Sequence, residues 1–356
     1  METLSRFFSS KHEKLIPYTP GEQPKDMKYI KLNTNESPYP PSPMAIEEAE
    51  KEARFLRLYP DPECTYLCED IAKYCGVEKE NVVLSNGSDE ILNFIFMAYG
   101  DNEHPFIFPD ITYGFYNVFC AVNNIPYEEI PLKDDFTIDF NDYCGKGKNV
   151  VIANPNAPTG IFAPLSEIEK LAESNPDNIV VVDEAYVDFG GESAIPLTKK
   201  YKNIIVVQTF SKSRSMAGAR LGFAVADKEI IKDLNTIRFS VNPYNINRMT
   251  MAAGSAAIKD CEYFEKNRQE IIATREKTAA SLYMMGFEVI PSKTNFLFVK
   301  NDKISGDELY KKLRKNGILV RHFTSKRICE YNRVTIGTPE DMETFVNTVK
   351  KILEDL

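Results

Sequence analysis

The residue types best suited to chemistry stand at the ends of short apolar segments. Asp183 follows "IVVV" and Lys212 follows "VVQTFS", and the two residues are 29 positions apart. That length suits one strand–helix–strand crossover, so both side chains should reach the same edge of a sheet. A partly desolvated lysine there favours the neutral, nucleophilic amine that Schiff-base chemistry needs. The alternatives are a helix-capping aspartate and a solvated surface lysine.

A second group of residues has the properties of a phosphate site. In "LSNGSDEILNF", Ser88 and Asp89 open a helix after a strand and a glycine, and exposed helical N–H groups attract anions. Thr209, Ser211 and Arg220 follow a later strand and are suitable phosphate ligands. Taken alone, the first segment is more simply a strand-to-helix turn with Ser88 or Asp89 as its N-cap.

Three further features complete the set. Asn156 lies in the proline-stiffened loop "NPNAPTG", and Tyr186 follows Asp183 by three residues. Arg321 and Arg333 lie on two consecutive predicted strands, and arginine binds carboxylate or phosphate in bidentate fashion. An acid, an asparagine, a tyrosine, a Schiff-base lysine and a phosphate cup together suit pyridoxal phosphate.

The elements that must position these residues predict an α/β fold. Apolar segments rich in β-branched residues begin near positions 81, 104, 149, 178, 203 and 221 and alternate with helical stretches. Their apolarity is continuous rather than alternating, which indicates a mostly parallel sheet covered by helices on both faces. Ligands of such sheets bind at the carboxyl ends of the strands, where the candidate residues stand.

The length of 356 residues favours two domains. Residues 1–43 are polar and proline-rich and predict an extended arm, and residues 44–248 hold the predicted strands of the large domain. A long polar helix over about 260–285 and alternating apolar segments predict a smaller α+β domain over 249–356. We expect the arm to join this smaller domain.

Composition excludes several classes of protein. The net charge of −9 would repel nucleic acid and anionic lipid, and the longest aliphatic runs are too short to span a membrane. Charges near the N-terminus leave no room for a signal peptide, so we expect a cytoplasmic protein. The cysteines form no C-x-x-C pair and the three histidines lie apart from them in sequence, so no metal site is expected.

Taken together, the motifs resemble those of fold type I pyridoxal-phosphate aminotransferases, and within that family the histidinol-phosphate aminotransferases. They run from about Pro17 to Thr338 and read "PYTPGEQP", "LNTNESPYPPSP", "YPDP", "NGSDE", "PNAPTG", "DEAY", "TFSKSRSMAGARLG" and "RVTIGT". The resemblance implies a mostly parallel seven-stranded sheet sandwiched by helices, a smaller α+β domain, pyridoxal 5'-phosphate as cofactor, and a homodimer with shared active sites.

The resemblance also implies roles for individual residues. Lys212 would bind the cofactor and move the substrate proton, Asp183 would keep the pyridine nitrogen protonated, and Tyr186 would bond the ring oxygen. The other expected cofactor-binding residues are Tyr59 from the neighbouring subunit, Ser88, Asp89, Tyr113, Asn156, Thr209, Ser211 and Arg220. The expected substrate-binding residues are Tyr18, Asn35, Arg321 and Arg333.

The substrates implied are a small amine and a 2-oxo acid, with L-histidinol phosphate and 2-oxoglutarate as the leading pair. The chain departs from the usual pattern at Ser37, Ala157 and Ala219, and it has an additional basic residue, Arg214. Threonine-phosphate decarboxylases and aromatic amino-acid aminotransferases share the implied fold and stay open as alternatives. A non-catalytic cofactor-binding module is disfavoured by the negative charge, and a dinucleotide-dependent dehydrogenase by the absence of G-x-G-x-x-G after any predicted strand.

Overall fold

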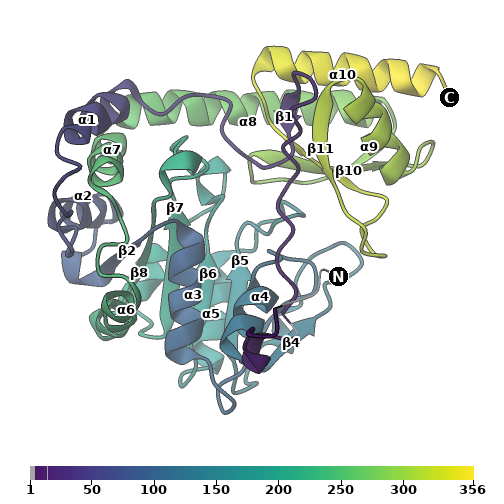
Figure 1. Ribbon diagram of the computed structural model, residues 1–356. Coiled ribbons are helices and arrows are strands. Elements are labelled where there is room, and N and C mark those ends of the chain that lie inside the picture. The colour runs from purple at the N-terminus through teal and green to yellow at the C-terminus, as the bar shows by residue number, and fades with distance from the viewer. Residues whose placement is uncertain (1–4, 14) are drawn as a thin grey trace.

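Two β-sheets organise the chain, and the long helix α8 (Cys261–Met284) leads from beside α7 (Arg248–Lys259) to the smaller sheet (Figure 1). The computed structural model describes residues 5–13 and 15–356. The larger sheet carries Asp183 and the segment with Lys212, and the smaller sheet carries Arg321 and Arg333, so each sheet supplies candidate residues.

The larger sheet has seven strands in the order β2-β8-β7-β6-β5-β3-β4. Their bounds are β2 (Val82–Ser85), β3 (Phe106–Pro109), β4 (Tyr127–Ile130), β5 (Asn149–Ala153), β6 (Val180–Asp183), β7 (Ile204–Thr209) and β8 (Gly222–Ala226). Only β8 is antiparallel to its neighbours, so the predicted mostly parallel seven-stranded sheet is confirmed. The segment of β4 was not predicted, because its sequence "YEEI" is polar and mostly exposed at the sheet edge.

Both faces of this sheet are covered by helices. In β5, Val150 and Ile152 point into one core and Val151 into the other. The first core includes α2 (Thr65–Cys75), α5 (Leu165–Ser174) and α7 (Arg248–Lys259), and the second includes α3 (Ser88–Tyr99), α4 (Tyr116–Asn123) and α6 (Lys228–Val241). This double burial explains why the central strands are continuously apolar.

Helix α1 (Pro43–Ala53) packs on α7 at one end of the molecule. The helical pattern of the sequence, "MAIEEAEKEARFLRL", continues to Leu58 and predicts a helix of that length, but α1 is shorter and the chain continues in turns from residue 54. Helix α7 was not predicted as a separate element, because its small residues "MAAGSAA" carry little periodic signal.

The smaller sheet has five strands in the order β1-β11-β12-β10-β9. Their bounds are β1 (Ile30–Leu32), β9 (Phe287–Ile290), β10 (Phe296–Asn301), β11 (Ile318–His322) and β12 (Asn332–Thr335), and helices α8, α9 (Gly306–Lys315) and α10 (Pro339–Glu354) pack with them. Strand β1 pairs in parallel with β11, so part of the N-terminal arm is a strand of this sheet. The domain limits 1–43, 44–248 and 249–356 stay predictions.

Among the described residues, no helix has the length and apolarity required to cross a membrane. Within the same residues, no group of three or more His, Cys, Asp or Glu side chains is placed to hold a metal ion.

Candidate active site

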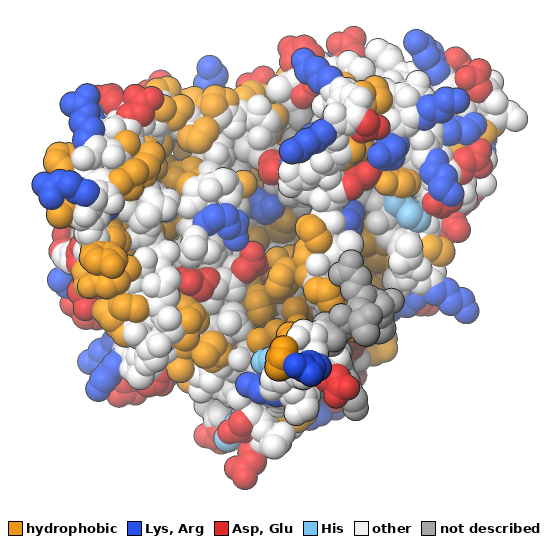
Figure 2. Space-filling model, viewed as in Figure 1, with side chains coloured by type: hydrophobic (Ala, Val, Ile, Leu, Met, Phe, Trp, Pro, Cys, Tyr) orange, Lys and Arg blue, Asp and Glu red, His pale blue; other side chains and the backbone are white. Residues whose placement is uncertain are grey.

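A cavity of about 270 Å³ lies at the carboxyl ends of β6 and β7. Figure 2 shows the molecule hollowed between its two lobes. The cavity is lined by Thr34, Glu36, Ser88, Asp89, Tyr113, Ala153, Pro155, Ala157, Asp183, Ala185, Tyr186, Thr209, Ser211, Lys212, Ala217 and Arg220. The predicted cofactor residues therefore meet in one place, apart from Asn156 and Tyr59, which do not line this cavity.

Lys212 reaches this cavity from the segment that follows β7. Its Nζ donates to the carbonyl oxygen of Thr34 at 3.3 Å and lies 5.7 Å from the centre of the Tyr186 ring. The amine is thus held between the arm and the large sheet, with an aromatic ring beside it. A positioned amine in a partly buried cavity is suited to nucleophilic attack and proton transfer.

Asp183 is the last residue of β6 and is 5% exposed. Burial raises the pKa of its carboxyl to about 6, although hydrogen bonds from the Tyr116 hydroxyl (2.8 Å) and the Ala185 backbone N–H (3.2 Å) lower it. A buried carboxylate held by two donors on its own chain is well placed to stabilise a cationic group in the cavity.

The residues predicted to bind the cofactor phosphate converge at the start of α3. Gly87 has a φ of +85°, a backbone conformation that favours glycine, and Nη2 of Arg220 lies 2.5 Å from the position that a Cβ would take there. Arg220 also contacts the Asp89 carboxylate at 3.0 Å and the Ser211 hydroxyl at 3.4 Å, and Thr209 donates to Ser211 at 3.0 Å. The first N–H groups of α3 have no intrahelical partner and complete a site for an anion.

The side chains of Asp89 and Asn156 are both engaged within the protein. The Tyr113 hydroxyl donates to Asp89 at 2.7 Å, so the carboxylate is shared between Tyr113 and Arg220. Asn156 Nδ2 donates to the Ile111 carbonyl oxygen and to the Thr159 hydroxyl, each at 3.0 Å. Neither amide hydrogen of Asn156 is free for a ligand in this arrangement, and its bond to a cofactor stays a prediction.

The two predicted substrate arginines are directly opposite each other on β11 and β12. Arg333 Nη2 donates to the Asn33 carbonyl oxygen at 3.2 Å, its buried Nε has no hydrogen-bond partner among the described residues, and burial lowers its pKa. Arg321 Nη2 lies 3.5 Å from the carbonyl oxygen of Thr19 in the arm. Two guanidinium groups, one with an unused donor, therefore form a site suited to a dianion.

Tyr18 and Asn35 take different positions around this site. The Tyr18 ring packs 4.5 Å from the ring of Phe115, which precedes α4, so the arm reaches across to the large domain. Asn35 is buried, donates to the Tyr186 hydroxyl at 2.9 Å and accepts from the Thr335 hydroxyl at 2.9 Å. Its contact in this structure is with Tyr186, and a direct contact with substrate stays a prediction.

Tyr59 lies outside the cavity. Its side chain is 78% exposed and stacks on Tyr244 with ring centres 4.6 Å apart. This position leaves the hydroxyl available to another subunit, in keeping with the expectation that the resemblance implied, which stays a prediction.

Sequence reasoning missed three residues at the site. Tyr116 donates to Asp183, and Thr34 and Glu36 line the cavity. Tyr116 follows the predicted residue Tyr113 in the segment "ITYGFY", and Thr34 and Glu36 flank Asn35, so the available signal was their closeness in sequence to residues that were predicted.

The additional basic residue Arg214 is structural. Its guanidinium lies 3.6 Å from the ring centre of Phe264 and 5.0 Å from that of Tyr74, and Nη1 donates to the Ala257 carbonyl oxygen at 2.9 Å. These contacts place it between α2, α7 and α8, where it does not line the cavity.

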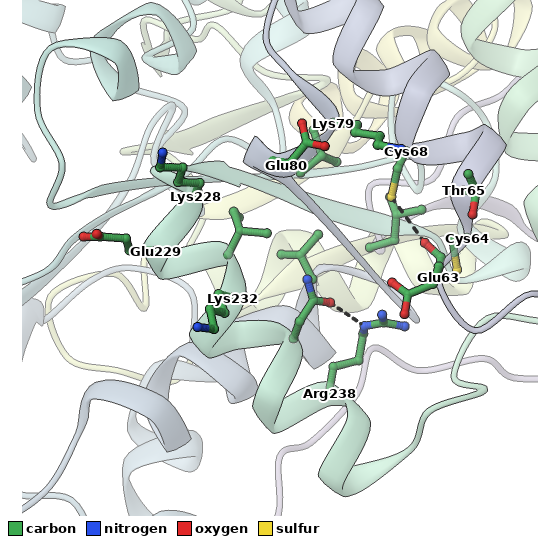
Figure 3. A pocket seen from close by; sticks show the side chains of 15 residues that line it. Glu63, Cys64, Thr65, Cys68, Lys79, Glu80, Lys228, Glu229, Lys232 and Arg238 are labelled. Carbon is green, nitrogen blue, oxygen red and sulfur yellow. Dashed lines mark hydrogen bonds between the residues drawn. The ribbon is translucent and has the colours of Figure 1, made fainter.

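A larger cavity, of about 600 Å³, lies between α2, α6 and β2 (Figure 3). Its labelled side chains carry charges of both signs and converge on no common point. Arg238 donates through Nη1 to the Pro62 carbonyl oxygen at 2.6 Å and through Nε to Asn235 at 2.9 Å, so its guanidinium joins segments of the fold. None of the predicted site residues lines this cavity.

The chain is similar to known proteins over nearly its whole length. The profile of the family described as "Aminotransferase class I and II" matches residues 27–349. A histidinol-phosphate aminotransferase of Clostridium acetobutylicum is 49% identical over 98% of this chain and 100% of the relative, and one of Brachyspira hyodysenteriae is 50% identical over 99% and 100%.

Solved structures show the same fold. The histidinol-phosphate aminotransferase of Sinorhizobium meliloti in complex with pyridoxal-5'-phosphate superimposes with a TM-score of 0.90 at 23% identity, over 99% of both chains. A histidinol-phosphate aminotransferase structure from Clostridium acetobutylicum gives 0.85 at 23% identity, over 92% of this chain and 99% of that one.

Proposed function

Because this chain belongs to the class I and II aminotransferases, we propose that it transfers the amino group of L-histidinol phosphate to 2-oxoglutarate. The products are imidazole acetol phosphate and glutamate, a reaction of histidine biosynthesis, and the cofactor is pyridoxal 5'-phosphate. The observation that carries the proposal is the pair of opposed arginines, Arg321 and Arg333. Neither lines the cavity that holds Lys212 and Asp183, but Arg333 donates to the carbonyl oxygen of Asn33, the residue before Thr34 in the cavity lining. This arrangement suits a phosphorylated amine that reacts at the lysine.

The residues that line the cavity fit pyridoxal phosphate. Gly87 leaves the α3 N-terminus open beside Arg220, which suits the phosphate, and Asp183 offers a buried carboxylate for the ring nitrogen. Lys212 supplies the amine for covalent attachment. The chemistry that this cofactor supplies when bound is an electron sink for the carbon from which a proton is removed.

Residues of the chain provide the proton transfer and the positioning that the reaction requires. Lys212 Nζ would take the proton from the substrate carbon and carry it during the reaction, since it is the amine in the cavity and is held by Thr34. Asp183 holds a proton at the ring nitrogen, because its buried negative charge favours the cationic form. Tyr186 is fixed by Asn35 and forms one wall beside the amine.

Arg321 and Arg333 bind the substrate phosphate, and then a carboxylate of the second substrate. Burial of Arg333 strengthens its attraction for an anion, because less water competes for its donors. Tyr18 closes the site from the arm and packs on Phe115. The site therefore selects an amine that carries an anion at a fixed distance from its reacting carbon.

An Arg321→Ala variant is expected to raise the KM for L-histidinol phosphate by about tenfold or more, the effect of losing a charge-assisted bond of about 1.5–3 kcal/mol. The KM for glutamate should rise less, because a carboxylate has fewer acceptor oxygens and a lower charge than a phosphate. Steady-state kinetics with each amino donor measure both values. Equal increases for the two donors would contradict phosphate recognition by Arg321.

The substrate assignment itself is tested with the purified wild-type protein. Its absorbance spectrum is recorded before and after separate additions of L-histidinol phosphate, O-phospho-threonine and phenylalanine. We expect the band of the lysine-bound cofactor to fall with L-histidinol phosphate and to return with 2-oxoglutarate. Release of carbon dioxide from O-phospho-threonine, without reaction of histidinol phosphate, would overturn the assignment.

The proposal includes a homodimer in the cytoplasm. Large apolar side chains are exposed on α1, on α6 and on the segments that follow them, and hydrophobic surface gathers over α1 and α2 (Figure 2). The exposed residues after α1 are Phe55, Leu56, Leu58 and Tyr59, and those on or after α6 are Phe239, Val241 and Tyr244. The rings of Tyr59 and Tyr244 stack, so the two groups adjoin, and a second subunit would cover them. All seven cysteines are free thiols, which suits a reducing compartment.

Shared active sites predict complementation between two impaired variants. A Lys212→Ala subunit lacks its own amine but still carries Tyr59, whereas a Tyr59→Ala subunit has the amine and lacks the tyrosine. Dimers that contain one subunit of each kind should hold one complete site. Co-refolded mixtures are therefore expected to show more activity than the sum of the separate variants. Simple additivity, in a protein that sediments as a dimer, would contradict the sharing of Tyr59.

A further inference from the structure

The loop that joins β11 to β12 contacts the large domain through one arginine. Arg327 Nη1 lies 2.8 Å from the Asp110 carboxylate, and its Nη2 donates to the carbonyl oxygens of Leu132 at 2.8 Å and Lys133 at 3.1 Å. The strands that flank this loop carry Arg321 and Arg333. The guanidinium fork of Arg327 thus attaches the strands of the arginine pair to the large domain.

Asp110, the partner of Arg327 in the large domain, is held in place by contacts of its own. It directly follows β3, its Oδ1 accepts from the Leu132 backbone N–H at 2.9 Å, and its Oδ2 receives Arg327. The next residues are Ile111, whose carbonyl oxygen accepts from Asn156, and then Thr112 and Tyr113. A displacement of Asp110 would therefore also displace the adjoining segment, which places Tyr113 in the cavity lining.

Apolar contacts support the same connection. Phe136 of the large domain packs edge-on against Phe298 and Tyr331 of the small domain, with ring centres 5.9 and 5.3 Å away. Phe323, at the start of the loop, lies about 6 Å from both substrate arginines: 6.0 Å from Arg321 and 5.9 Å from Arg333. The loop is therefore packed at both ends and has little freedom to move independently of the arginine pair.

We infer that Arg327 is a positioning residue that sets the distance between the arginine pair and the Tyr113 segment, and through it the preference for a phosphorylated amine. The inference rests on the proposed function. The amine must reach Lys212 while the phosphate reaches Arg321 and Arg333. The distance between these groups therefore determines which length of substrate can make both contacts. The ion pair between Arg327 and Asp110 joins the loop next to the arginine pair to the segment that holds Tyr113. Neither residue lines the cofactor cavity.

The test compares L-histidinol phosphate with L-histidinol, which lacks the phosphate. In an Arg327→Met variant, the preference in kcat/KM for the phosphorylated amine is expected to fall about tenfold, because misplacement of a binding group by a fraction of an ångström weakens a two-point contact. The change should be in KM, while kcat and the absorbance of the lysine-bound cofactor stay unchanged. Arg327→Lys should recover part of the preference, since it keeps the charge but loses the fork.

Two further variants isolate the pair. Asp110→Asn should reproduce the loss, and the double variant Arg327→Met with Asp110→Asn should lose no more than either single variant. Lys148→Met is the matched control: it breaks a half-exposed ion pair with Glu128 within the large domain, and it should leave the preference unchanged.

Equal losses on both amines, or an unchanged preference in folded Arg327→Met protein, would overturn the inference. Failure of wild-type protein to use L-histidinol phosphate would contradict the proposed function instead. In that case hydrogen exchange still tests the positioning role of Arg327, because it requires no substrate. Backbone amides of residues 110–113 and 323–331 should exchange faster in Arg327→Met than in wild type or Lys148→Met. Unchanged exchange in both segments would overturn it.

Discussion

Replacement of Lys212 by alanine is expected to abolish both turnover and the visible absorbance of the lysine-bound cofactor. The lysine provides the amine for covalent attachment and the base for proton transfer, and a positioned general base alone contributes about 10²–10⁴-fold to a rate. Because both functions are lost together, kcat should fall by about 10⁴-fold or more. Single-turnover kinetics and an absorbance spectrum of the variant measure the two effects.

The variant should fold, because within the described part of the chain Lys212 makes a single hydrogen bond, a contact of 3.3 Å to Thr34. Lys228→Ala, at the exposed start of α6, is a control of the same chemical change and should keep full activity. A small primary amine added to the Lys212→Ala protein should restore part of the turnover, since it replaces the missing base. Turnover by the untreated variant at the wild-type rate would contradict the proposed role of Lys212.

The part of the site on the large sheet was predictable because its positions follow from strand physics. Asp183 and Lys212 each end a continuously apolar segment, and the parallel pairing of β6 with β7 brings those ends together. The distance between the two residues in sequence was therefore informative about their distance in space. Asp89 and Arg220 meet for a different reason, because the antiparallel pairing of β2 with β8 places the end of β2 beside the start of β8.

Other parts could not be predicted, because they depend on how the two domains meet. Arg327 and Asp110 are 217 residues apart, and each is an ordinary charged residue within its own segment. The assignment of Asn35 to the substrate, made from a motif, stays a prediction, but its hydrogen bonds with Tyr186 and Thr335 could not be predicted. Local patterns carry no information about such contacts until the tertiary packing is known.

Asp183 provides the second large effect, and it combines a loss of activity with a gain in stability. An Asp183→Asn variant should lower kcat by about 10²–10³-fold, the usual loss when one preorganised electrostatic group is removed from a reacting centre. The asparagine keeps the oxygen that accepts from Ala185, and the Tyr116 hydroxyl can turn to accept from the new amide. The fold should therefore tolerate the change.

The stability effect concerns the protein without cofactor. The pKa of Asp183 is about 6 in the folded chain against 3.8 for an ordinary aspartate, so the folded state binds more protons between these values. The stability of the wild-type apoprotein should then fall as pH rises from about 4 to 6, and the loss should persist above pH 6. Asparagine does not titrate, so apo Asp183→Asn should melt at a higher temperature than apo wild type at pH 8.

The melting temperatures of the two apoproteins should converge, or reverse in order, near pH 4, where the wild-type carboxyl is protonated. Asp177→Asn, which alters an exposed acid, should follow the wild-type curve at both pH values. Identical pH dependence in Asp183→Asn and wild type would show that Asp183 carries no burial penalty. Because the cofactor's ring nitrogen is expected to offset that penalty as a cation, adding pyridoxal phosphate should raise the melting temperature of wild type more than that of the variant.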